Sequence, residues 1–251
     1  MIYCHGNACD IGGMYQEFEY YSKFFQLNVI GVEYPGYGVS PGLPNASDIS
    51  RDTRIVWEFL VGELNIPPGN IIVFGRSIGT GVACRLVYDL QKLQTAPAAL
   101  ILQSPYRSIS HIADDLMGPV VGLLAPKIFD NEAFIKEIQV PLLFIHGTKD
   151  TLIASSHSQE LYQLSKAEKK LIHLAVGADH NFWNFQDDIC DPIVLFLTSY
   201  FTPIPCEGEM PSIPEDLFQP PSLIPEPQNT NGGFLSFFSQ SIQTTQNLFK
   251  K

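Results

Sequence analysis

Short runs of apolar, β-branched residues alternate with longer amphipathic segments from residue 1 to about residue 200. The short runs are almost continuously apolar, which is typical of strands buried on both faces, and the longer segments follow the helical period. This alternation predicts an α/β domain in which helices cover both faces of a mostly parallel sheet. The expected strands are Met1–Cys4, Val29–Glu33, Ile71–Gly75, Ala98–Gln103, Leu142–His146 and Lys170–Ala175. The expected helices span residues 13–25, 48–64, 78–93, 157–166 and 185–200, with Asp48 and Ser158 as caps.

The pattern changes after Tyr200. Residues 202–232 contain eight prolines and several acids but no Lys or Arg, so we expect residues 201–232 to form an extended, Pro-rich acidic linker. The terminal segment, residues 233–251, places several apolar side chains on one helical face, namely Phe234, Phe238, Ile242 and Phe249. As an amphipathic helix, this segment could bind a membrane surface or dock onto the preceding domain. The third alternative is that the segment has no fixed structure, and the sequence leaves all three open.

Composition narrows the classes of function. The formal net charge of −11 disfavours nucleic acid as a partner, because phosphate binding needs a basic surface. The five cysteines are scattered without a CxxC pair or zinc spacing, which favours a reducing compartment and indicates no metal site. No apolar stretch approaches the roughly 20 residues that span a bilayer. We therefore expect a cytoplasmic protein that needs no cofactor and touches membranes at most peripherally, through residues 233–251.

The pattern Gly-x-Ser-x-Gly occurs twice, at Gly38-Val39-Ser40-Pro41-Gly42 and at Gly75-Arg76-Ser77-Ile78-Gly79. A nucleophile elbow presents its serine between a strand and a helix, and the next residue donates its N–H to the oxyanion. Pro41 has no N–H and interrupts a helix, so Ser40 is assigned to a turn. Ser77 follows an apolar strand and precedes a helix with small first residues, and we predict that it is the nucleophile.

A serine nucleophile needs a base and a group that orients the base. Asp150 follows the strand that ends at His146, where open parallel sheets place their sites, and it is the candidate acid. His180 lies in the loop after the last predicted strand and is the candidate base. The remaining histidines fall in strands, at their ends or near helices, so we expect structural roles for them: His111, His146, His157 and His173. Asp179 neighbours His180 in sequence, but adjacency does not aim its carboxylate at the imidazole.

Two backbone donors are expected to stabilise the oxyanion of a tetrahedral intermediate. Ile78, directly after the nucleophile, supplies one N–H. The loop after the first strand, His5-Gly6-Asn7-Ala8, is placed to supply the other. We assign it to the backbone of Asn7, with Ala8 as the alternative.

Several separated motifs in this order make residues 1 to about 198 resemble the α/β-hydrolase superfamily, and in particular the depalmitoylases called α/β-hydrolase domain-containing protein 17. The shared motifs are His5-Gly6-Asn7-Ala8, Asp10-Ile11-Gly12, Glu33-Tyr34-Pro35-Gly36-Tyr37-Gly38-Val39-Ser40, the Ser77 elbow, Ser104-Pro105, His146-Gly147-Thr148-Lys149-Asp150, Ser156-His157, and Gly177-Ala178-Asp179-His180-Asn181. Glu33 stands where that family usually has Asp. The resemblance also implies that the chain starts at the family's third strand, so that the leading antiparallel strands are absent and Val29–Glu33 becomes a sheet edge.

What the resemblance implies is hydrolysis of a thioester, with removal of a palmitoyl chain from a protein cysteine. The expected substrate is an acylated protein, a lipid or another ester. Residues 105–139 are the predicted lid, and their apolar side chains either line an acyl pocket or pack on the core. A general carboxylesterase, lipase or peptidase remains the alternative within the same fold, and a non-catalytic scaffold is the alternative outside enzymes.

Overall fold

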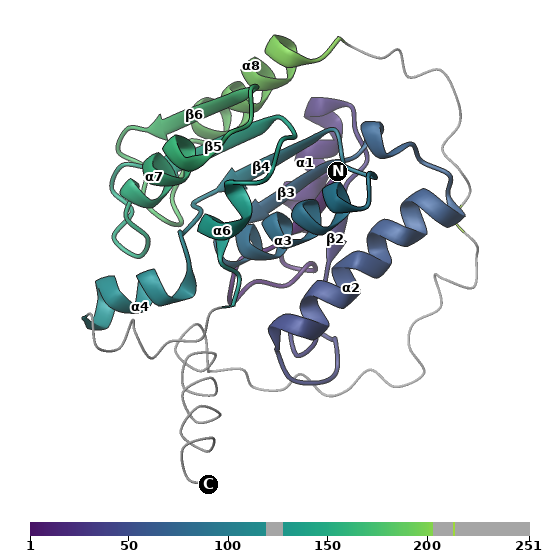
Figure 1. Ribbon diagram of the computed structural model, residues 1–251, viewed down its shortest axis with the longest axis horizontal. Coiled ribbons are helices and arrows are strands. Elements are labelled where there is room, and N and C mark those ends of the chain that lie inside the picture. Colours follow the sequence, from purple (N-terminus) through teal and green to yellow (C-terminus); the bar gives the residue numbers. More distant parts are fainter. Residues whose placement is uncertain (119–127, 203–212, 214–251) are drawn as a thin grey trace, which may run out of the picture.

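The computed structural model describes residues 1–118, 128–202 and 213, and for Leu116 and Met117 it describes the backbone only (Figure 1). Its centre is a sheet of six strands in the order β2-β1-β3-β4-β5-β6, and every strand pair is parallel. The strands are β1 (Ile2–Cys4), β2 (Ile30–Val32), β3 (Ile72–Arg76), β4 (Ala99–Gln103), β5 (Leu142–Gly147) and β6 (Lys170–Ala175). All six strands therefore lie where the apolar runs predict them.

Helices cover both faces of this sheet (Figure 1). The α-helices are α1 (Tyr15–Phe25), α2 (Ala46–Glu58), α3 (Ile78–Lys92), α4 (Ile109–Met117), α6 (Asn131–Ile135), α7 (Ser156–Leu164) and α8 (Asp191–Tyr200). A π-helical turn, Phe59–Glu63, extends α2, a second one, Phe185–Cys190, precedes α8, and a 3₁₀ turn, Pro68–Asn70, leads into β3. The expected α/β class, with a parallel sheet between two helical layers, is confirmed.

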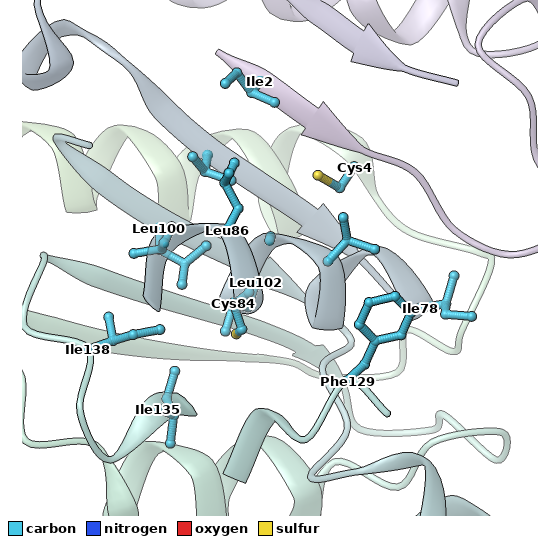
Figure 2. Close-up of a cluster of buried hydrophobic side chains, with 14 of the residues drawn as sticks. Ile2, Cys4, Ile78, Cys84, Leu86, Leu100, Leu102, Phe129, Ile135 and Ile138 are labelled. Atoms are coloured by element: carbon cyan, nitrogen blue, oxygen red, sulfur yellow. The ribbon is translucent and has the colours of Figure 1, made fainter. Parts of the chain in front are cut away.

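Alternate residues of each strand pack into two separate hydrophobic cores, because successive side chains of a strand point to opposite faces of the sheet. On one face Tyr3, Phe74 and Ile145 pack against α1 and α8. On the other face Ile2, Leu100 and their neighbours pack against α2, α3, α6 and α7 (Figure 2). Burial on both faces explains why the strands read as continuous apolar runs.

The predicted helix caps are wrong in both places. The N-cap of α2 is Asn45, whose side chain accepts the backbone N–H of Asp48, so the helix begins two residues earlier than expected. Ser158 lies inside α7, and its hydroxyl bonds His146 instead. Asp48 and Ser158 are residue types that favour caps, but Asn45 caps α2 and the N-cap of α7, Ser155, makes no side-chain capping bond.

Residues 105–139, the predicted lid, contain α4 and α6, which the sequence analysis missed. Ile109 and Ile112 are fully buried in the core between the sheet and α3, so these two side chains pack on the domain. Residues 119–127 of this segment lie outside the described residues, as do almost all of the predicted linker and the whole terminal segment 233–251.

Candidate active site

Ser77 joins the carboxyl end of β3 to the first turn of α3. Its backbone has φ 52° and ψ −121°, a conformation that L-residues rarely adopt and that commonly marks functional turns. Its N–H donates to Gln103 O at 2.9 Å, and its carbonyl accepts from Thr80 Oγ1 at 2.7 Å. These bonds hold the strained turn, and the Ser77 hydroxyl makes no capping bond to α3.

The glycines on either side of Ser77 are required by space. A Cβ on Gly79 would lie 2.1 Å from the carbonyl oxygen of Cys4, and one on Gly75 would lie 2.6 Å from Gly79 O. Because backbone atoms cannot move aside as a flexible side chain can, only glycine lets α3 approach β1 and β3 this closely. The pattern Gly-x-Ser-x-Gly thus follows from the packing of the turn.

The structure brings Ser77, His180 and Asp150 together, although they are far apart in sequence. His180 Nε2 lies 3.0 Å from Ser77 Oγ, and His180 Nδ1 lies 2.7 Å from Asp150 Oδ2. A carboxylate only accepts, so Nδ1 carries the hydrogen and Nε2 is left to accept the proton of the Ser77 hydroxyl. Ser77 and Asp150 are buried and the His180 side chain is 11% exposed, which keeps water from competing for these bonds.

Asp150 sits in a site built for a carboxylate. Its Oδ1 accepts the backbone N–H groups of Leu152 at 2.9 Å and Ile153 at 2.8 Å. Burial raises the pKa of Asp150, but hydrogen bonds from His146, His180 and the Ile153 N–H outweigh it, and the pKa lies well below its usual range. Asp150 is therefore ionised at neutral pH and can stabilise an imidazolium at His180.

The loops that carry the acid and the base are bound to each other. Thr148 N–H donates to Ala175 O and Lys149 N–H to Ala178 O, both at 2.9 Å. Asp179 accepts the N–H groups of Asn181 and Phe182, both at 2.8 Å, so its carboxylate shapes the turn beyond His180. Asp150, and not the sequence neighbour Asp179, is the carboxylate bonded to His180.

The two predicted oxyanion donors belong to two segments that adjoin Ser77, the start of α3 and the loop after β1. Ile78 begins α3, where helix N–H groups point outward and favour negative charge. Gly6 packs against the nucleophile, since a Cβ there would lie 3.6 Å from Ser77 Cβ, and Asn7 and Ala8 follow it. Within the described residues no hydrogen bond uses the backbone N–H of Asn7 or Ile78. The alternative donor Ala8 has φ 57°, a left-handed turn conformation.

Sequence reasoning missed a second histidine beside the acid. His146 is fully buried at the end of β5, and its Nε2 lies 3.3 Å from Asp150 Oδ2 and 2.8 Å from Ile153 O. Its Nδ1 faces Ser158 Oγ at 2.6 Å. The structural role predicted for His146 thus includes support of Asp150. The sequence signal for this contact was that the two residues are only four positions apart.

A pocket with a volume of about 490 Å³ lies between α2, α3 and residues 128–134. Three arginines are among its polar lining residues, namely Arg51, Arg54 and Arg85. Each pairs with carboxylates of its own helix: Asp48 and Asp52 for Arg51, Glu58 for Arg54, and Asp89 for Arg85. Arg85 is eight residues beyond Ser77 on α3, which at 1.5 Å per residue is roughly 12 Å along the helix. This pocket is distinct from the Ser77 relay.

Two further findings concern ligands and membranes. Among the residues that the structure describes, no group of three or more His, Cys, Asp or Glu side chains could hold a metal ion. None of the helices in the same residues is long and apolar enough to cross a membrane.

The chain is similar in sequence to known proteins over the residues that form this site. Residues 68–180, which include Ser77, Asp150 and His180, match the sequence model of the serine hydrolase (FSH1) family. Over 182 residues the chain is 31% identical to human α/β hydrolase domain-containing protein 17B, covering 72% of this chain and 60% of that protein. Over 181 residues it is 30% identical to the 17C protein of Xenopus laevis, covering 72% and 55%. The chain thus spans about half to three fifths of the length of these relatives.

Solved structures agree on the fold. The α/β hydrolase of Vibrio vulnificus superposes with a TM-score of 0.68 at 22% identity, covering 78% of this chain and 73% of that one. At this identity the likeness shows the fold alone. Fold and sequence together show a chain with the α/β-hydrolase fold that is similar in sequence to the α/β hydrolase domain-containing 17 proteins.

Proposed function

We propose that this protein is a serine hydrolase that cleaves acyl thioesters or esters through Ser77, His180 and Asp150. The observation that carries the proposal is the continuous relay from Ser77 Oγ to His180 Nε2 at 3.0 Å and from His180 Nδ1 to Asp150 Oδ2 at 2.7 Å. This geometry lets a weak nucleophile lose its proton as it attacks.

The reaction has two halves. Ser77 Oγ attacks the acyl carbonyl while His180 Nε2 takes its proton, and the tetrahedral intermediate collapses as the bond to sulfur or oxygen breaks. The leaving thiol or alcohol takes the proton from His180, and the acyl group remains on Ser77. Water, deprotonated by His180, then releases the carboxylic acid and restores the Ser77 hydroxyl. Asp150 holds the His180 ring and stabilises its positive charge in both halves.

The oxyanion is assigned to the backbone N–H groups of Ile78 and Asn7. Ile78 directly follows Ser77, and Asn7 follows Gly6, which packs against Ser77; neither N–H has an acceptor within the described residues. Removal of one such donor typically lowers kcat by about 10²- to 10³-fold.

The favoured substrate is a palmitoyl thioester on a protein cysteine. Two observations support this choice: the sequence similarity to the 17B and 17C proteins, and the exposed apolar side chains on the loops that carry His180 and Asp150. Phe182 and Val176, in the loop that carries His180, are 79% and 91% exposed, and Leu152 projects from the Asp150 loop. Exposed apolar side chains on the loops of a site suit a long acyl chain.

Two assays test this function. A fluorophosphonate probe should label the wild-type protein and leave Ser77→Ala unlabelled; no labelling of the wild type, or equal labelling of both, would indicate a non-catalytic scaffold. Turnover of a palmitoyl-thioester peptide should exceed that of a short-chain ester with the same enzyme. A strong preference for the short ester would instead favour a general carboxylesterase, and cleavage of an amide would favour a peptidase.

The proposal also includes peripheral contact with membranes through residues 233–251, whose apolar side chains fall on one predicted helical face. Deletion of these residues should reduce binding to liposomes and leave hydrolysis of a soluble short ester unchanged. Unchanged liposome binding would refute this part of the proposal and leave the catalytic part intact.

A further inference from the structure

The segment after β2, residues 33–42, takes no part in the relay, yet its side chains reach the loop after β1, residues 5–11. We call them the β2 loop and the β1 loop. Tyr37 donates its hydroxyl to Asn7 Oδ1 at 2.7 Å, and Tyr34 donates to His5 O at 3.1 Å. Glu33 accepts from His5 Nε2 at 3.0 Å and from Ile11 N–H at 3.1 Å. The β2 loop therefore forms hydrogen bonds with the β1 loop at both of its ends, His5 and Ile11, and at Asn7.

The Glu33 contact is closely fitted. His5 is fully buried, and its ring stacks on Tyr34 with centroids 4.1 Å apart. A Cβ on Gly38 would lie 2.4 Å from Glu33 Oε2, and Gly38 has φ 50°. Glycine at this position thus leaves room for the carboxylate that holds the two ends of the β1 loop.

We propose that Tyr37 is a positioning residue for the oxyanion site, and that it acts through the side chain of Asn7 to orient the backbone N–H at that position. The inference rests on the proposed function, because it assigns the β2 loop a role in the same reaction. It extends that function by assigning a task to the motif Glu33–Gly38.

The chemistry of the contact makes Tyr37 a fixed donor. Burial raises the pKa of Tyr37 to about 12, with Cys9 and Glu33 adding to the effect, so its hydroxyl stays protonated at neutral pH. The Tyr37 ring packs edge-on against His5 and Tyr34, each with centroids 5.5 Å apart. Replacement by Phe therefore removes the hydrogen bond and leaves the ring in its packing.

A double-mutant cycle tests whether Tyr37 acts through Asn7. The variants are Tyr37→Phe, Asn7→Ala and the pair together, and Asn7→Ala removes Oδ1 while keeping the backbone N–H. The readouts are the rate of phosphonylation of Ser77 by a fluorophosphonate and the kcat and KM for ester hydrolysis. Each single variant should lower kcat and the phosphonylation rate by about tenfold, less than loss of a whole oxyanion donor, with KM little changed.

The double variant should be no slower than either single variant, because both changes break the same contact. Tyr20→Phe is the matched control, since that hydroxyl donates to Gln186 at 3.1 Å on the surface beside α8. Wild-type rates in Tyr37→Phe, or independent effects that multiply in the double variant, would overturn the proposal.

Amide hydrogen exchange gives a second readout that does not depend on activity. Exchange in residues 5–11 should be faster in Tyr37→Phe than in the wild type and in Tyr20→Phe, while exchange in β4 and β5 stays unchanged. Unchanged exchange in the β1 loop would contradict the positioning role. If the wild type neither reacts with the probe nor hydrolyses esters, the proposed function fails, and faster exchange in Tyr37→Phe alone would still show that Tyr37 holds the loop.

Discussion

The two Gly-x-Ser-x-Gly segments of this chain share a pattern and differ in structure. Ser77 connects β3 to α3 with φ 52°, and its hydroxyl faces His180. Ser40 lies in a turn, where its N–H donates to Tyr37 O at 2.8 Å and its carbonyl accepts from Gly36 at 3.1 Å. The same five-residue pattern thus gives a strained strand-to-helix turn in one place and a hydrogen-bonded surface turn in the other.

The flanking glycines show why. At the Ser77 elbow, glycine is needed for space, since a Cβ on Gly79 would lie 2.1 Å from Cys4 O. In the Ser40 turn both glycines have a left-handed backbone, Gly38 with φ 50° and Gly42 with φ 103°. A Cβ on Gly38 would meet the side chain of Glu33, and one on Gly42 would have no atom nearer than 3.6 Å, so neither glycine admits a helix against a strand. The Gly-x-Ser-x-Gly pattern therefore indicates a nucleophile only where it joins a strand to a helix and its glycines let the two pack closely.

The sharpest contrast is between the two serines. Ser77→Ala should lower acyl hydrolysis by roughly 10⁴- to 10⁶-fold, because no nucleophile remains beside His180. Ser40→Ala should retain wild-type activity, since the bonds of Ser40 in its turn are made by the backbone. Steady-state hydrolysis of an ester measures both, and a large loss in Ser40→Ala would reverse the assignment.

The two neighbouring carboxylates give the next largest contrast. Asp150→Asn should lower kcat by about 10⁴-fold, because an amide cannot hold the reactive tautomer of His180. Asp179→Asn should have a small effect, since its amide oxygen can still accept from Asn181 and Phe182. Equal losses in the two variants would argue against Asp150 as the partner of His180.

Glycine-to-alanine substitutions should lower the stability of the fold by different amounts in the Ser77 elbow and in the Ser40 turn. Gly79→Ala should lower the free energy of unfolding by about 3 kcal/mol, because the new methyl group meets backbone. Gly42→Ala should cost about 1 to 2 kcal/mol, from its positive φ alone. Gly62→Ala, with nothing within 4 Å, serves as the control and should stabilise by about 0.5 to 1 kcal/mol. Chemical denaturation measures all three, and a smaller loss in Gly79→Ala than in Gly42→Ala would contradict the account.

The smallest predicted effect depends on pH. Because the folded-state pKa of Asp150 lies below its ordinary value, its contribution to stability is present above pH about 4 and is lost as pH falls through the folded-state value. The difference in unfolding free energy between the wild type and Asp150→Asn should therefore be greatest near pH 7 and narrow towards pH 3. A difference that stays constant across this range would mean that the charge of Asp150 is not what stabilises the fold.

Sequence patterns predicted the sheet well because its inner strands, among them β1, β4 and β5, are buried on both faces and read as apolar runs. They failed between residues 105 and 139, where α4 and α6 are short and separated, and at Asp48, where the neighbour Asn45 makes the cap. Chain order and strand ends were enough to select Ser77, Asp150 and His180 as neighbours. The contacts of Glu33, Tyr37 and His146 depend on how loops meet in space, which no local pattern encodes.

The central claim is that Ser77 is the nucleophile, and mapping the covalent adduct of a fluorophosphonate by peptide mass spectrometry tests it most directly. We expect a single adduct on the peptide that contains Ser77, formed by the wild type and abolished by Ser77→Ala. An adduct on Ser40, or the absence of any adduct on the folded wild-type protein, would contradict it.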